Sequence, residues 1–251
     1  MSERERGDGT MATEHIVKAY DDELKQLSNM ISRMGGLAEN QVATAIEAVV
    51  RRDNDAAIET IESDEKVDQL EHEVDQFCVR LLALRQPMAG DLRRIIGALK
   101  IASDLERIAD YGANVAKRAL QLNQIKPIKP VYAIPRMGKL AQEMIKDVLD
   151  SYAEGDVEKA LDVWHRDEEV DEMYTSLFRE LLTYMMEDPR NITACTHLLF
   201  IAKNIERVGD HATNIAETIH FLVVGGPFSH GRRRTHDGTV TIGLDIDADS
   251  S

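Results

Sequence analysis

The chain contains two copies of one pattern, and this internal duplication restricts its fold more than any other feature of the sequence. Residues 33–38 (RMGGLA) recur 103 positions later as residues 136–141 (RMGKLA). The same spacing relates residues 64–68 (DEKVD) to residues 167–171 (DEEVD). A spacing held across separate segments indicates a repeated structural unit, so the chain is expected to fold as two similar halves.

A third matching segment completes each unit. Residues 105–110 (LERIAD) correspond to residues 205–210 (IERVGD) at a spacing of 100. Apolar residues follow helical periodicity between the prolines, and only 5% of residues are aromatic, which argues against an all-β sandwich. The predicted fold class is therefore all-α, with two tandem three-helix bundles related by internal duplication. The expected helices are 14–52, 55–84, 91–122, 134–154, 157–186 and 192–224.

The ends of the chain and one internal segment differ in composition from the helical units. The first residues are polar, three prolines lie close together before the second unit, and a Gly-, Ser- and Arg-containing stretch follows it. We therefore expect a flexible N-terminal extension, a first bundle, a proline-containing connector, a second bundle and a disordered C-terminal tail. Their expected limits are 1–12, 13–123, 124–135, 136–224 and 225–251.

The net charge limits the classes of partner. With 30 Lys and Arg against 45 Asp and Glu, the chain carries a net charge of −15. Such a surface repels nucleic acid and anionic lipid, so we expect no nucleic-acid partner and membrane association only through other proteins. Cys78 and Cys195 belong to no CxxC motif, and neither a signal peptide nor a membrane-spanning stretch is evident. We therefore expect a cytoplasmic protein.

Much of what the two units share is acidic rather than apolar. Asp64 and Asp68 lie one helical turn apart, and Glu106 and Asp110 form a second pair that interrupts an apolar stripe. Carboxylates one turn apart repel each other, so a compensating positive charge is expected. Oxygen ligands that converge from two helices suit Fe, Mn or Mg ions and, less selectively, Zn. The second unit keeps both pairs, as Asp167 with Asp171 and Glu206 with Asp210.

Two neighbours of the acidic pairs also recur in both units. Asn114 and Asn214 lie one further turn along the third helices, and they are expected to add a neutral oxygen or to orient a metal ligand. Arg107 and Arg207 adjoin the glutamates in sequence, but their helical angle points them away. We therefore expect the two arginines to contact surface acids or a protein partner.

Other interpretations of the acidic pairs stay open at this stage. One is a metal-free network of acids and arginines in a purely structural bundle. Another is a carboxylate-bridged metal enzyme of ferritin-like or phosphohydrolase type, because Glu217 and His220 form half of a di-iron signature. This half-signature occurs in one unit only. Since the sequence contains no phosphate-binding loop, nucleophile elbow or Ser/His/Asp set, catalysis is not expected.

Several segments together resemble the PhoU family of phosphate-transport regulatory proteins. They are residues 34–39 (MGGLAE), 80–87 (RLLALRQP), 105–111 (LERIADY) and 205–211 (IERVGDH). The resemblance covers about residues 11–224 and includes both copies of the acidic motif. It implies tandem three-helix bundles that bind multinuclear metal clusters, with these metal residues: Asp64, Asp68, Glu106, Asp110, Asp167, Asp171, Glu206 and Asp210.

The same resemblance implies a function without known catalysis. Members of the family act as negative regulators of phosphate uptake and of the phosphate-starvation response. The implied partners are the ATPase subunit of a phosphate ABC transporter and a membrane sensor histidine kinase, and a homodimer is expected. The N-terminal extension and the tail with Arg232, Arg233 and Arg234 lie outside the resemblance.

Overall fold

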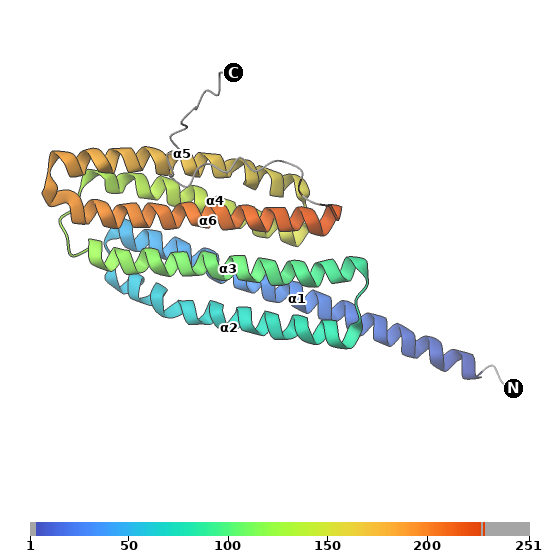
Figure 1. Cartoon of the computed structure of the whole chain (residues 1–251). Helices are drawn as coiled ribbons and strands as arrows, with labels where there is room; N and C mark the ends of the chain where they lie inside the picture. The colour runs from blue at the N-terminus through green and yellow to red at the C-terminus, as the bar shows by residue number, and fades with distance from the viewer. Residues whose placement is uncertain (1–3, 227, 229–251) are drawn as a thin grey trace, which may run out of the picture.

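A computed structural model describes residues 4–226 and 228 of the chain, with side chains described from residue 19 onward. Within these residues the chain is all-α, as predicted (Figure 1). Its helices are α1 (Arg4–Arg51), α2 (Asn54–Arg85), α3 (Ala89–Leu122), α4 (Ile134–Glu154), α5 (Val157–Glu187) and α6 (Ile192–Val224). Short 3₁₀ helices, η1 (Lys129–Ala133) and η2 (Pro189–Asn191), precede α4 and α6.

The six helices form two bundles that lie side by side along their length. Figure 1 shows α1, α2 and α3 in one bundle and α4, α5 and α6 in the other, with α3 and α6 adjacent. Helix α1 also packs against α4 across the boundary. One continuous core of buried apolar side chains runs through both bundles, so the two repeats share their interior.

The turns that separate the first two helices of each unit are built from repeated residues. Asp53 and Asp156 occupy the same repeat position, and both cap the helix that follows. The Asp53 carboxylate accepts hydrogen bonds from the backbone N–H groups of Asp55 and Ala56, and Asp156 accepts one from Lys159. An aspartate at this position satisfies backbone donors that the helix itself leaves unpaired. The duplication therefore preserved the N-cap of the second helix of each unit as well as the apolar core.

The two bundles approach closely because glycines lie between them. A side-chain carbon added at Gly138 of α4 would lie 2.5 Å from Cδ1 of Ile46 of α1. The equivalent Gly35 of α1 lies in the same way against Leu149, which is the repeat counterpart of Ile46. This reciprocal contact gives the pair α1 and α4 an approximate two-fold symmetry, which is what docking of duplicated units produces.

The expected domain limits can be compared with the described helices at the N-terminal end, at the connector and, in part, at the C-terminal end. Helix α1 begins at Arg4, so the described backbone of residues 4–12 is helical; the flexibility expected for residues 1–12 stays a prediction. The connector holds η1, and α4 begins two residues before the expected limit of 136. The disordered tail predicted for 225–251 lies outside the described residues except for Gly225, Gly226 and Phe228. No described helix is both long and apolar enough to cross a membrane.

Candidate metal centre

The four predicted acidic ligands of the first unit form what we call the first acidic face: Asp64, Asp68, Glu106 and Asp110. The Asp64 carboxyl on α2 interacts electrostatically with Asp110 on α3, and Glu106 on α3 interacts with Asp68 on α2. Carboxylates predicted from separate segments therefore face one another across two helices. Glu71 extends the same face along α2, since it too interacts with Asp68 and Glu106.

The acids of the first acidic face are held in an environment that disfavours their charge. Burial raises the pKa of Glu106 to about 6, and the neighbouring Asp110 charge adds to the effect. Burial also raises the pKa of Asp64 and of Glu71, and nearby carboxylates push in the same direction. Partial burial and like charge both penalise a carboxylate that has no counter-ion. A bound cation would relieve both penalties.

A buried glutamine anchors the α2 side of this face. Gln41 of α1 is only 2% exposed, and its Nε2 donates to Oδ1 of Asp64 at 2.7 Å and to the carbonyl of Ala109 at 3.0 Å. This amide links α1, α2 and α3 at the centre of the first bundle. Gln41 is not among the sequence-predicted site residues, although a polar residue within an apolar helical stripe is the signal that points to it.

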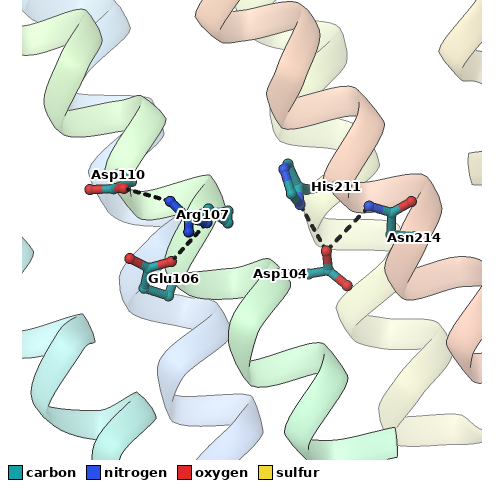
Figure 2. A network of polar contacts seen from close by, with 6 residues as sticks. All are labelled: Asp104, Glu106, Arg107, Asp110, His211 and Asn214. Carbon is teal, nitrogen blue, oxygen red and sulfur yellow. Dashed lines mark hydrogen bonds and ion pairs between the residues drawn. The ribbon is translucent and has the colours of Figure 1, made fainter.

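Arg107 takes part in the first acidic face, which corrects the expectation that it points away. Its guanidinium lies between the two acids of its own helix, with Nε 3.5 Å from Glu106 and Nη1 3.5 Å from Asp110 (Figure 2). A long arginine side chain can fold back along the helix, so the direction of its Cβ does not fix the position of its charge. At 55% exposure the Arg107 side chain is nevertheless largely in solvent.

The second acidic face consists of Asp167, Asp171, Glu206 and Asp210, from α5 and α6. Glu206 lies at its centre: the residue is 8% exposed, and it interacts electrostatically with Asp171 and Asp210. Oε1 of Glu206 accepts a hydrogen bond from Nζ of Lys203 at 2.7 Å, whereas Oε2 is buried without a hydrogen-bond partner. Burial raises the pKa of Glu206 even though the Lys203 ammonium opposes the shift.

Asp167 lies close to α6 at Gly209. A side-chain carbon at Gly209 would lie 2.9 Å from Oδ1 of Asp167, so a larger residue there would make the Asp167 carboxylate shift; the first unit has Ala109 at this position. The two faces differ at three further repeat positions. The first unit has Gln41, Glu71 and Asp75 where the second has Met144, Tyr174 and Phe178.

A second polar network lies between the bundles rather than on either acidic face. Nδ1 of His211 and Nδ2 of Asn214, both on α6, donate to Oδ1 of Asp104 on α3 at 2.8 and 3.3 Å (Figure 2). The Tyr111 ring lies 5.5 Å from the His211 ring, and the Arg207 guanidinium lies 5.7 Å from the centre of the Tyr111 ring. We call these five residues the inter-bundle network.

The inter-bundle network includes Asn214, for which a role near the metal ligands is expected, and His211, for which none is. Asn214 donates to Asp104 of the other bundle, and its expected role of orienting a metal ligand on the second acidic face stays a prediction. The role expected for Asn114 stays a prediction. The repeat counterpart of His211 is Tyr111, and the two rings pack against each other.

Glu217 and His220, which form half of a di-iron signature, contact different residues. Glu217 accepts a hydrogen bond from Nε1 of Trp164 at 3.3 Å, and the His220 ring packs edge-on against Phe228 at 5.1 Å. No group of three or more His, Cys, Asp or Glu side chains among the described residues is arranged to hold a metal ion. Metal binding by the two acidic faces therefore stays a prediction that would require carboxylates to change rotamer.

Both repeats match the model of one protein family, described as the PhoU domain. The matched residues are 31–119 and 134–219, which together span more than half of the chain and contain both acidic faces. The chain belongs to the PhoU family.

Two relatives of this PhoU chain match it over nearly their full length. It is 56% identical over 214 residues to the phosphate-specific transport system accessory protein PhoU homolog of Caulobacter vibrioides, covering 85% of this chain and 93% of that one. The homolog of the same name from Rhizobium meliloti is 50% identical over 234 residues, covering 93% and 98%.

Solved PhoU structures share its architecture. PhoU from Pseudomonas aeruginosa is 40% identical, superposes with a TM-score of 0.81, and covers 82% of this chain and 100% of that one. The phosphate transport system regulatory protein PhoU from Streptococcus pneumoniae is 31% identical with a TM-score of 0.78, covering 84% and 100%.

Proposed function

We propose that this PhoU protein is an accessory protein of a phosphate-specific transport system that represses phosphate uptake and the phosphate-starvation response when phosphate is plentiful. The observation that carries this proposal is the match to proteins of that name over 93% of their length at 56% identity. Both repeats lie within the match, so the proposal concerns the whole helical body of the chain.

In this proposal the protein works through contacts rather than through catalysis. Its partners are the ATPase subunit of a phosphate ABC transporter and a membrane sensor histidine kinase, which it couples from the cytoplasm, reaching the membrane only through them. The protein acts as a homodimer. The joint core supports such a role, because two bundles that share one interior present their outer helices as a single rigid platform.

The acidic faces bind metal ions in the same proposal. The donors are carboxylate oxygens, which suit Fe, Mn, Mg or Zn ions, and the ligands are the eight carboxylates of the two faces. The raised pKa values of Glu106 and Asp64, together with the unpartnered Oε2 of Glu206, support this assignment, because each marks an acid that lacks sufficient positive charge. A metal-loaded face becomes locally cationic and attracts an acidic partner surface.

A genetic test separates this function from a purely structural role. In the source organism, loss of the gene is expected to switch on a phosphate-starvation reporter in phosphate-rich medium, and the wild-type copy is expected to restore repression. A copy with the exposed substitution Gly36→Ala serves as the matched control and should also restore repression, since nothing lies within 4 Å of the added carbon. A reporter that stays repressed without the gene would contradict the proposal.

The partners are tested by purification from the same strains. The protein is expected to co-purify with the transporter ATPase and with the cytoplasmic part of the kinase after cross-linking in phosphate-rich cells. Recovery of neither partner, in cells where the reporter responds to loss of the gene, would limit the proposal to regulation by another route.

A further inference from the structure

The second acidic face contains a positive charge that the first face lacks at the same place. Nζ of Lys203 lies 2.7 Å from Oε1 of Glu206, and the ammonium also lies over the Tyr174 ring, 5.3 Å from its centre. The repeat counterpart of Lys203 is Ser103, an exposed and uncharged residue of α3. The counterpart of Tyr174 is Glu71, so the aromatic ring that faces this ammonium is likewise absent from the first face.

The arginines do not make the two faces equivalent. Arg107 lies in the first acidic face, but at 3.5 Å from each of its acids and with 55% of its side chain exposed. Arg207 is directed to the ring of Tyr111 in the inter-bundle network. The first face therefore has Arg107 loosely held near its rim and the exposed Lys117, whose charge acts on Asp64, but neither makes a short hydrogen bond to an acid of that face. Lys203 makes a short charge-assisted bond to the most buried acid of the second face.

The pairing of Lys203 with Glu206 leaves one oxygen of that acid without a donor. Oε2 of Glu206 is buried and unpartnered, although the residue as a whole is 8% exposed. A buried carboxylate oxygen in this state costs free energy, which favours binding of a second positive group. The second acidic face thus already contains the Lys203 ammonium, and the unpartnered Oε2 of Glu206 still favours binding of a further cation.

We propose that Lys203 is a tethered counter-cation of the second acidic face, so that metal ions bind the first face more tightly and load the second only when the Lys203 ammonium moves aside. This inference rests on the proposed metal binding and adds an order of loading to it. Displacing Lys203 breaks a hydrogen bond between two charged groups, which weakens metal binding at the second face by about tenfold.

The test measures Mn²⁺ binding to one face at a time in the full chain by titration calorimetry. The second face alone is retained in a chain that carries Asp64→Ala, Asp68→Ala, Glu106→Ala and Asp110→Ala. The first face alone is retained in a chain that carries Asp167→Ala, Asp171→Ala, Glu206→Ala and Asp210→Ala. Circular dichroism confirms that each chain keeps its helices.

Substitutions at Lys203 test the second face. Lys203→Met and Lys203→Gln are expected to tighten Mn²⁺ binding there by about tenfold, because each removes the competing cation. Lys203→Arg keeps a positive charge and is the matched control, with affinity expected to stay near that of the parent chain. Equal affinities for the parent and for both neutral variants would overturn the inference.

The reciprocal substitution transfers the lysine to the first face. Ser103→Lys is expected to weaken Mn²⁺ binding by about tenfold, and Ser103→Gln, which adds length without charge, is expected to leave it unchanged. An unchanged affinity in Ser103→Lys would also overturn the inference. If the first face binds Mn²⁺ and Lys203 has no effect, only the order of loading fails; if neither face binds Mn²⁺, the metal-binding proposal fails and this inference with it.

Discussion

Tyr111 of α3 and His211 of α6 occupy the same position in the two repeats, and their rings face each other with centroids 5.5 Å apart. Equivalent residues meet in this way only where the approximate two-fold axis passes between the units. The contacts around them are not symmetric. Asp104 accepts from His211 and Asn214, whereas its counterpart Asn204 donates to the carbonyl of Phe200 in its own helix. The duplicated units diverged where they dock.

We predict that His211→Ala destabilises the chain through this junction. The His211 and Asp104 side chains are 21% and 16% exposed, so the hydrogen bond between them is shielded from water. Loss of a hydrogen bond to a charged group costs about 1.5–3 kcal/mol of unfolding free energy. Urea denaturation measures the change, and a double-mutant cycle with Asp104→Ala isolates the contribution of the pair.

His72→Ala is the matched control for this prediction. His72 is exposed on α2, and its ring shares a hydrogen bond with Gln76 of the same helix. Its replacement is expected to change the free energy of unfolding by less than about 0.5 kcal/mol. Equal losses in the two alanine variants would show that the inter-bundle network contributes nothing specific.

We predict opposite effects for two adjacent glycines of α1. Gly35→Ala is expected to destabilise the chain by about 1–3 kcal/mol, because the added methyl group meets the side chain of Leu149 across the bundle boundary. Gly36→Ala is expected to stabilise it by about 0.5–1 kcal/mol, since nothing lies within 4 Å and alanine favours the helix. Thermal unfolding of both variants checks the pair. Stabilisation by Gly35→Ala would mean that α1 and α4 do not pack as described.

The fold was predictable because the sequence repeats both its apolar periodicity and its caps. Each helix follows from local information, and the short turns leave few ways to connect three helices. The predicted helix ends at 154 and 224 are the observed ones, and both precede a glycine with positive φ, Gly155 and Gly225. The acidic pairs were placed on facing helices for the same reason, since helical geometry fixes the direction of each Cβ.

The rest of the site was not predictable, because it depends on side-chain torsions and on how the bundles dock. The flexible side chain of Arg107 returns to its own helix, which the angle of its Cβ does not reveal. The contact of His211 with Asp104 joins residues 107 positions apart and exists only once α3 lies on α6. Lys203 lies one turn before Glu206, yet only the burial of that acid shows why the pairing matters.

We predict that Glu106 makes the metal-free chain less stable as the pH rises. Burial raises its folded pKa from 4.5 to about 6, so the folded chain holds this proton more tightly than the unfolded chain does. Its stabilising contribution is therefore fully present below pH 4.5 and is lost as the pH rises through about 6. In the presence of a chelator, Glu106→Gln is expected to be more stable than wild type at pH 7 by about 1–2 kcal/mol, and the difference should vanish near pH 4.5.

Glu23→Gln provides a control of opposite sign for this pH dependence. Glu23 of α1 accepts hydrogen bonds from Arg85 at 2.8 and 3.1 Å, and this pairing lowers its pKa. Its contribution is present above its unfolded pKa and is lost as the pH falls. The Glu23→Gln variant should therefore be less stable than wild type at pH 7, with a penalty that shrinks in acid. Parallel pH profiles for the two glutamine variants would contradict the assignment.

We predict that neutralising the first acidic face stabilises the metal-free chain but makes it less stable than wild type when metal is bound. The variant carries Asp64→Asn, Asp68→Asn, Glu106→Gln and Asp110→Asn, which keep side-chain size and remove charge. In a chelator it should unfold at a higher temperature than wild type, because the buried charge and the mutual repulsion that raise the pKa of Asp64 and of Glu106 are gone. With Mn²⁺ at about a hundred times its dissociation constant, wild type should gain about 2.7 kcal/mol from that face, and the variant should not. Equal Mn²⁺-dependent shifts in both proteins would show that the first acidic face binds no metal, whatever its charge does to the metal-free fold.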